Sequence, residues 1–159
     1  MTLVNARAAF EKAITDAVAA ADNTVIMSYD NVTFTTPGKT KKYITTSIIF
    51  NQSTFQPQGG AVDYYVGSTQ CNVYVPKGKG SSVLSTLSEA VIDGLSSINA
   101  SNYSDPFSCS PRVGEINGPI PVEIEDRSHF LGIISCAFSA NSWYNSYIYL
   151  ILWQEQLIF

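Results

Sequence analysis

The chain has 159 residues, of which 45% are hydrophobic and 14% are charged, and its formal net charge is -4. This length suits one domain with its own core, and the negative total gives no overall attraction to DNA or to anionic lipid. The charged share lies well below the roughly one quarter that is usual. Ser, Thr, Asn, Gln and Tyr take its place, which fits a subunit covered by its neighbours and equally a weakly charged monomer.

Cysteine and histidine usage argues against a disulfide framework and against a metal site. The three cysteines, Cys71, Cys109 and Cys136, are odd in number and far apart, which indicates a reducing compartment. The sequence has no C-x-x-C pair and a single histidine, His129, whereas a zinc site needs about four converging ligands. We expect no metal and no cofactor.

The first third of the chain predicts a helix and two strands. From Leu3 to Ala21 apolar residues recur at steps of three and four, which is typical of an amphipathic helix, and its acidic residues argue against a signal peptide. A short strand is expected over 24–29, followed by a loop that turns at Pro37-Gly38. Residues 43–50 alternate as a half-buried strand does, with Tyr43 on the wetter face.

A long strand and a second helix are expected next. The strand runs from Tyr64 to Val75 and stops at Pro76, because proline cannot donate to a ladder. Gly67 falls on its apolar face, where a missing side chain admits an aromatic ring or another backbone, or marks a bulge. The helix that follows carries an apolar stripe over 83–95.

The order of the elements predicts an α+β fold. Residues 96–112 have no apolar period and are expected to form a long surface connection. A bent or edge strand is expected over 113–124, and a buried strand over 130–139. The order α-β-β-β-α-β-β then predicts a mixed, mostly antiparallel sheet of about five strands with both helices on one face.

Residues 142–159 differ from the domain expected over 1–141. Seven consecutive residues, 147–153, are aromatic or aliphatic, which is too short a run for a helix to span a bilayer. As a bare strand the run is apolar on both faces and prone to aggregate. It is therefore either a last core strand or an extension that adds a strand to another subunit, and we predict the extension.

No motif in the sequence predicts catalysis. The segment PKGKGSS, residues 76–82, lacks the spacing of a phosphate loop and the third glycine of a dinucleotide motif, so a turn with Ser81 or Ser82 as helix cap is expected. His129 has no Gly-x-Ser-x-Gly partner and is expected to be a turn residue. Glu123 and Glu125 alternate as the wet side of a strand does. We expect no enzyme.

Several motifs in this order resemble the tail terminator, or tail-completion, proteins of long-tailed bacteriophages. They follow an Ala-rich first helix and precede the closing strand VEIEDRSHFLGIISCAFSAN: Asp30-Asn31-Val32 with Pro37, Tyr65-Val66-Gly67, and Pro76 through Gly80. The resemblance covers about residues 1–140. The extension after Asn141 departs from the short form of the family.

The resemblance implies a structural virion protein of the tail or neck, assembled in the host cytoplasm. A ring, expected to be a hexamer, would cap the tail tube, stop its polymerisation and join the head connector. Partners would be further copies, the tube protein, the connector and, in a contractile tail, the sheath, with DNA only passing through the lumen. The candidate interface residues are Lys39, Lys41, Lys42, Lys77, Lys79, Trp143, Tyr144, Tyr147, Tyr149 and Trp153.

Two other interpretations of the sequence stay open. One is a related neck or head-completion protein, and the other is a small carbohydrate- or ligand-binding module that uses the tyrosines and tryptophans.

Overall fold

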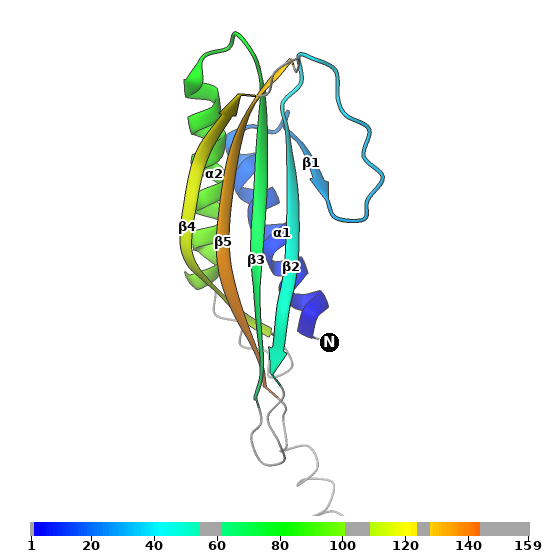
Figure 1. Ribbon diagram of the computed structural model, residues 1–159, viewed down its shortest axis with the longest axis vertical. Coiled ribbons are helices and arrows are strands. Elements are labelled where there is room, and N and C mark those ends of the chain that lie inside the picture. Colours follow the sequence, from blue (N-terminus) through cyan, green and yellow to red (C-terminus); the bar gives the residue numbers. More distant parts are fainter. Residues whose placement is uncertain (1, 55–61, 101–108, 124–127, 144–159) are drawn as a thin grey trace, which may run out of the picture.

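A five-stranded sheet with two helices on one face makes up the fold (Figure 1). The computed structural model describes residues 2–54, 62–100, 109–123 and 128–143. The elements are α1 (Thr2–Ala21), β1 (Ile26–Tyr29), β2 (Tyr43–Thr54), β3 (Val62–Pro76), α2 (Ser81–Ala100), β4 (Cys109–Glu123) and β5 (His129–Trp143). The strand order is β1-β2-β3-β5-β4, in which β1 runs parallel to β2 and the other pairs are antiparallel. The predicted α+β class and element order are confirmed.

The core lies between the helices and the sheet, because each strand turns alternate residues toward α1 and α2. The side chains that are almost fully buried there come from both layers: Phe10, Ile14 and Val18 of α1, Leu87, Val91, Leu95 and Ile98 of α2, and Ile44, Cys71, Val73, Val75 and Ile134 of the sheet. Neither α1 nor α2, the helices of the described residues, is long and apolar enough to cross a membrane.

Small residues let the two helices pack closely. A Cβ atom on Gly94 of α2 would lie 2.8 Å from the carbonyl oxygen of Ala13 and 3.1 Å from Cβ of Ala17. The Ala-rich face of α1 and the glycine of α2 therefore set the separation of the helix layer, as close backbone approach requires residues without large side chains.

Gly67 admits an aromatic ring, as the sequence predicted. A Cβ on Gly67 would overlap the carbonyl oxygen of Ile49 and the ring of Phe138, whose Cε1 would be 2.8 Å away. That ring packs against Phe10, with centroids 4.7 Å apart, and edge-on against Phe50, at 5.4 Å. The register of β2 on β3 also shifts beside this point, between Phe50 and Gln52. One glycine thus makes room for the aromatic cluster that joins α1 to the sheet.

Several boundaries differ from the sequence prediction. Beyond the expected limits of 50, 113 and 139, β2 continues to Thr54, β4 begins at Cys109 within the expected surface connection, and β5 continues to Trp143. Residues 96–100 were expected in a surface connection, but α2 continues to Ala100, since Ile98 is buried. The side chain of Asn99 also bridges to β4, donating to the carbonyl of Val113 (2.9 Å) and accepting from its N–H (2.7 Å). At its other end α2 begins at Ser81, so Gly80, with φ of 83°, precedes the helix where a serine cap was expected. Residues 101–108 lie outside the described part of the chain.

Side chains continue the ladder where the short strand β1 ends. The carboxylate of Asp30 accepts the N–H of Ile48 (2.9 Å), and Nη2 of Arg7 donates to the carbonyl of Ile48 (2.9 Å). Burial acts to raise the pKa of Asp30, but the hydrogen bonds from Ile48, Arg7 and Ser47 outweigh it, so its pKa lies below the ordinary 3.8. Asp30 therefore fixes the start of the loop that leads to β2.

Substituting Gly67 tests the aromatic cluster. In Gly67→Ala the new methyl must displace the Phe138 ring or the β2 backbone, and we expect the free energy of unfolding to fall by about 1–3 kcal/mol. Urea denaturation at matched protein concentration measures it. Gly38→Ala is the control, because nothing lies within 4 Å of a Cβ at that position. Equal stability of the two variants would contradict the packing described.

Candidate functional site

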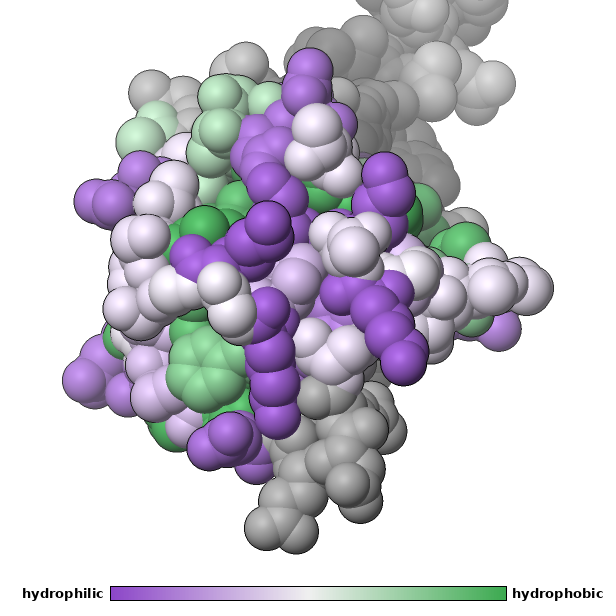
Figure 2. Space-filling view, turned by 90° about the horizontal axis from the view of Figure 1, so that it is seen from above, coloured by the Kyte–Doolittle hydropathy of each residue, from purple (hydrophilic) through white to green (hydrophobic). Residues whose placement is uncertain are grey.

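The fold brings both predicted lysine groups to the same end of the sheet. Lys39, Lys41 and Lys42 precede the first residue of β2, and Lys77 and Lys79 follow the last residue of β3. Because β2 and β3 are antiparallel, with Tyr43 opposite Tyr74, these two points are neighbours. We call this region the lysine end, and Figure 2 views it directly, with hydrophilic residues gathered over it.

Lys42 is held by an ion pair inside the subunit. Its Nζ contacts the carboxylate of Asp22, just after α1, and the two side chains are only 28% and 21% exposed. Hydrogen bonds from Lys42 and from the hydroxyl and N–H of Thr24 lower the pKa of Asp22 from 3.8 to about 2. Lys42 therefore ties α1 to β2 and is poorly placed to bind a partner.

Lys77 is anchored by its backbone and its side chain. Its N–H donates to the carbonyl of Ser128 (2.9 Å), and its Nζ lies 3.7 Å from Oε1 of Glu123 at the end of β4. Lys39, Lys41 and Lys79 are exposed as Lys77 is, but none of them forms an ion pair with another described residue. Of the five predicted lysines, these three can most readily meet another protein.

His129, expected in a turn, is instead buried at the first position of β5 and holds the loop before β2. It is 5% exposed, and its Nε2 lies 2.7 Å from the carbonyl oxygen of Lys41, so this nitrogen donates. In the neutral ring Nδ1 then accepts from the hydroxyl of Ser128, 3.0 Å away. His129 positions the backbone that carries Lys39 and Lys41.

Aromatic rings pack beside this histidine, and among them Tyr43, which was expected on the more exposed face of its strand, is buried. Tyr43 is 5% exposed, since it stacks on Tyr74 with centroids 4.3 Å apart and also contacts Phe34 of the loop and the edge of His129. The alternation pattern could not reveal this cover, which comes from a loop and from the start of β5.

The segment that resembled a phosphate loop forms the turn that was predicted. Gly78 and Gly80 have φ of 81° and 83°, values that glycine adopts without strain. A hollow of about 400 Å³ lies beside the turn, lined by Val75, Pro76, Lys77, Gly78, Gly80, Ser81, Glu123 and Phe130. The carboxylate of Glu123 at this hollow disfavours a phosphate there.

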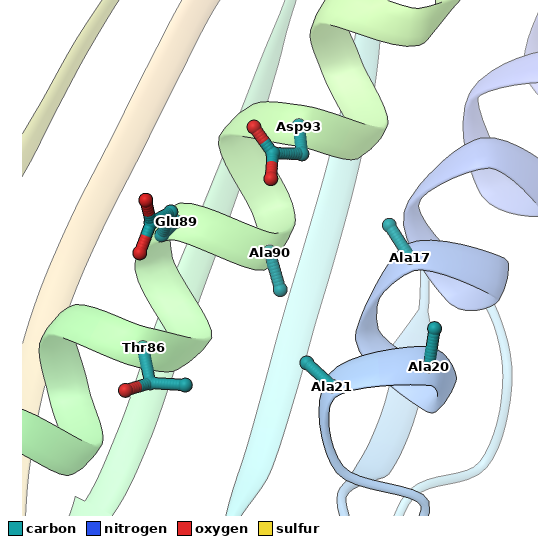
Figure 3. A pocket seen from close by; sticks show the side chains of 7 residues that line it. All are labelled: Ala17, Ala20, Ala21, Thr86, Glu89, Ala90 and Asp93. Carbon is teal, nitrogen blue, oxygen red and sulfur yellow. The ribbon is translucent and has the colours of Figure 1, made fainter.

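A second hollow lies between the helices. It has a volume of about 430 Å³ and is lined by Ala17, Ala20, Ala21, Thr86, Glu89, Ala90 and Asp93. Figure 3 shows Ala90 of α2 and Ala17 and Ala21 of α1 pointing into the space between the helices. The lining combines small side chains with the hydroxyl of Thr86 and two carboxylates.

The described residues offer no metal site and no reactive thiol. Among them, no three His, Cys, Asp or Glu side chains come together as a metal ion would require. Cys71 and Cys136 are buried free thiols, and burial raises their pKa values to about 12 and about 11. Thiols with such pKa values are poor nucleophiles at neutral pH.

The predicted aromatic contacts of the extension lie almost entirely outside the described residues. The backbone of Trp143 is the last to pair in β5, opposite Val62, two residues beyond the predicted domain boundary. Tyr144, Tyr147, Tyr149 and Trp153 are not described, and their role stays a prediction.

Fold and site together define a small α+β subunit with an exposed lysine end. Residues 5–97, more than half of the chain, match the model of the phage tail terminator proteins. The chain belongs to this family and is a structural protein of a phage tail. The match spans α1 through most of α2 and includes the three motifs noted in the sequence.

A solved structure supports the fold over a longer stretch. One protein chain, whose name states no function, superposes with a TM-score of 0.63 at 24% identity, covering 88% of this chain and 96% of its own. At this identity the likeness concerns the fold alone. No curated protein matches the sequence.

The ion pair of Lys42 predicts a pH-dependent stability. Because the pKa of Asp22 is about 2 in the folded chain and near 3.8 unfolded, its contribution is complete above about pH 4 and is lost as the pH falls through 2. We expect Asp22→Asn to lower the free energy of unfolding at pH 7 by on the order of 1 kcal/mol, with the difference shrinking toward pH 2. Denaturation at several pH values measures it.

Asp16→Asn is the matched control for this prediction. Asp16 pairs with Lys12 on the exposed surface of α1, where both side chains are more than 60% exposed. A smaller change is expected there. A difference for Asp22→Asn that stays constant from pH 7 to pH 2 would contradict the assignment.

Proposed function

We propose that this protein assembles as a ring, a hexamer, that caps the phage tail tube, ends its polymerisation and presents the surface to which the head connector joins. Membership of the tail terminator family carries the proposal. The role is structural and not catalytic, because a cap acts through the surfaces it offers.

The helix-free face of the sheet supports assembly with other copies. On β2, β3 and β5, the described residues that alternate with the core carry no charge: Thr45, Ser47 and Ile49, then Tyr64, Val66, Ser68, Gln70, Asn72 and Tyr74, then Leu131, Ile133, Ser135, Ala137, Ser139 and Asn141. The centres of protein interfaces are depleted of charge, whereas solvent-facing strands usually carry some. This face is the surface of the subunit best suited to be covered in the ring.

The lysine end supports contact with a differently charged partner. Lys39, Lys41 and Lys79 project from one end of an otherwise acidic chain, so an acidic ring of tube or connector protein would be attracted to it. Passing DNA would also be attracted, but the net charge of -4 makes a lumen-lining role less favourable.

Termination follows from having two unlike ends. One end of the ring complements the last ring of tube protein, and the other lacks whatever would recruit the next tube subunit. Specificity of this kind depends on a missing surface as much as on a matching one.

Tube growth provides the test. The tube protein of the same phage is polymerised with and without this chain, and tube lengths are read by electron microscopy. We expect short tubes that carry extra density at one end. Tubes of unchanged length without end density would refute the proposal.

The exposed lysines are expected to set the affinity for the tube end. Replacing Lys39 and Lys79 with glutamine should weaken binding about threefold to tenfold at low salt, with a smaller effect at high salt, because rim charges act mainly through long-range attraction. A pelleting assay with preformed tubes measures it. Lys12→Gln, a change on the exposed surface of α1, is the control; an equal loss in both variants would show that the lysine end has no special role.

A further inference from the structure

The C-terminal half of β2, Ile49–Thr54, is an open sheet edge. β1 pairs only with Tyr43–Thr46, and the side chains of Asp30 and Arg7 satisfy Ile48. β2 then continues for six more residues, Ile49–Thr54, and no described strand lies on its outer side. Figure 1 shows this part of β2 extending well below β1.

Features that usually protect a sheet edge are concentrated on the opposite side of the sheet. The edge strand β4 contains Pro111, Pro119 and Pro121 and two register shifts, all of which hinder pairing with another strand. The segment Ile49–Thr54 contains no proline and no charge, and it has one register shift, between Phe50 and Gln52. Of the two edges, β2 is the one prepared to accept a strand.

Apolar side chains lie on both sides of this open edge. Ile49 is 55% exposed on the helix-free face, and the half-buried Phe50 packs on the helix side beside Ala6 and Tyr65. A strand added here would meet an apolar side chain on each face, Ile49 and Phe50, and then the polar, exposed side chains of residues 51–54.

We propose that residues 147–153 of a neighbouring copy add to β2 as a strand along Ile49–Thr54. This run, YIYLILW, has aromatic or aliphatic residues on both faces and no charge, and its seven residues match the six of the open edge. Main-chain hydrogen bonds would supply affinity, and the alternating side chains would pack on Ile49 on one face and Phe50 on the other. The inference rests on the proposed ring, in which each copy has a neighbour.

Geometry disfavours the chain's own extension as the occupant. From β5 to the outer side of β2 are three strand spacings, about 14 Å, since β3 and β2 intervene. Trp143 and Tyr147 are separated by four residue steps, which span at most about 13–14 Å when fully extended. No chain length is left for the turn that would bring the extension back along β2. The extension of a neighbouring copy is not limited in this way.

Crosslinking between isotopically distinct copies tests the inference. A benzophenone amino acid replaces Ser53, an exposed edge residue, in 15N-labelled protein, which is mixed with unlabelled protein, assembled on tubes and irradiated. We expect crosslinked peptides that join labelled residue 53 to unlabelled residues within 144–159. Crosslinks only within one copy, only to another segment or partner, or none at all would overturn it.

A matched pair of variants tests the same edge by hydrogen bonding. The N–H of Ile48 points away from β3, toward the open side of β2. Because the register shifts between Phe50 and Gln52, Ser53 is the later residue of β2 whose N–H also points to that side. Ser53→Pro removes that N–H, whereas Ser53→Ala keeps it. Only the proline variant should therefore weaken assembly, so that copies associate at a concentration at least about tenfold higher. Equal assembly of both variants would overturn the inference.

Deleting residues 144–159 separates this inference from the proposed function. If the truncated chain still forms rings and shortens tubes as the full chain does, strand addition is wrong and the capping function stands. If the full chain itself neither forms rings nor shortens tubes, the proposed function fails first. We expect the truncated chain to assemble weakly, and we expect no substitution at Ser53 to restore its assembly.

Discussion

A five-stranded sheet has two faces and two edges, and the described part of this chain supplies two helices to cover them. Both pack on the same face, where Gly94 lets α2 approach α1 and Gly67 lets Phe138 reach Phe10. On the other face the loop residue Phe34 covers Tyr43 at one end, and no described helix or strand covers the rest of that face or the Ile49–Thr54 edge of β2. The helix-free face carries no charged side chain among the described residues of the three central strands, β2, β3 and β5. Such a face suits a surface that other copies bury.

The main elements follow from local patterns that the sequence shows directly. The three-and-four spacing of α1, the alternation of β3 and the place of Gly67 on the apolar face of β3 have local causes, so they could be predicted. The ring that fills the space beside Gly67 comes from Phe138 on β5, which no local pattern identifies. The helical conformation of residues 96–100 could not be predicted in this way. It is stabilised by the burial of Ile98 in the core and by the hydrogen bonds of Asn99 to β4, both of which involve residues distant in the sequence. For the same reason the burial of Tyr43 and His129 depends on contacts that no local pattern contains.

The candidate site shows the same division between local and long-range information. The sequence presented five lysines as equivalent, and antiparallel pairing brings them to one end. Their roles are separated by carboxylates distant in the chain: Asp22 holds Lys42, and Glu123 lies beside Lys77. His129 then fixes the loop that carries Lys39 and Lys41. Family membership places the subunit in a phage tail, and the ion pairs separate the lysines held within the subunit from those that are free of such pairs among the described residues.

The central claim is that the uncovered surfaces of this subunit are buried by further copies of itself at the end of a tail tube. The number of copies per tube end tests it most directly, and mass measurement of capped tubes by native mass spectrometry or scanning transmission electron microscopy can count them. The account predicts a closed ring of several copies, six by the proposal, at one end of each tube. A single copy bound to each tube end would contradict it.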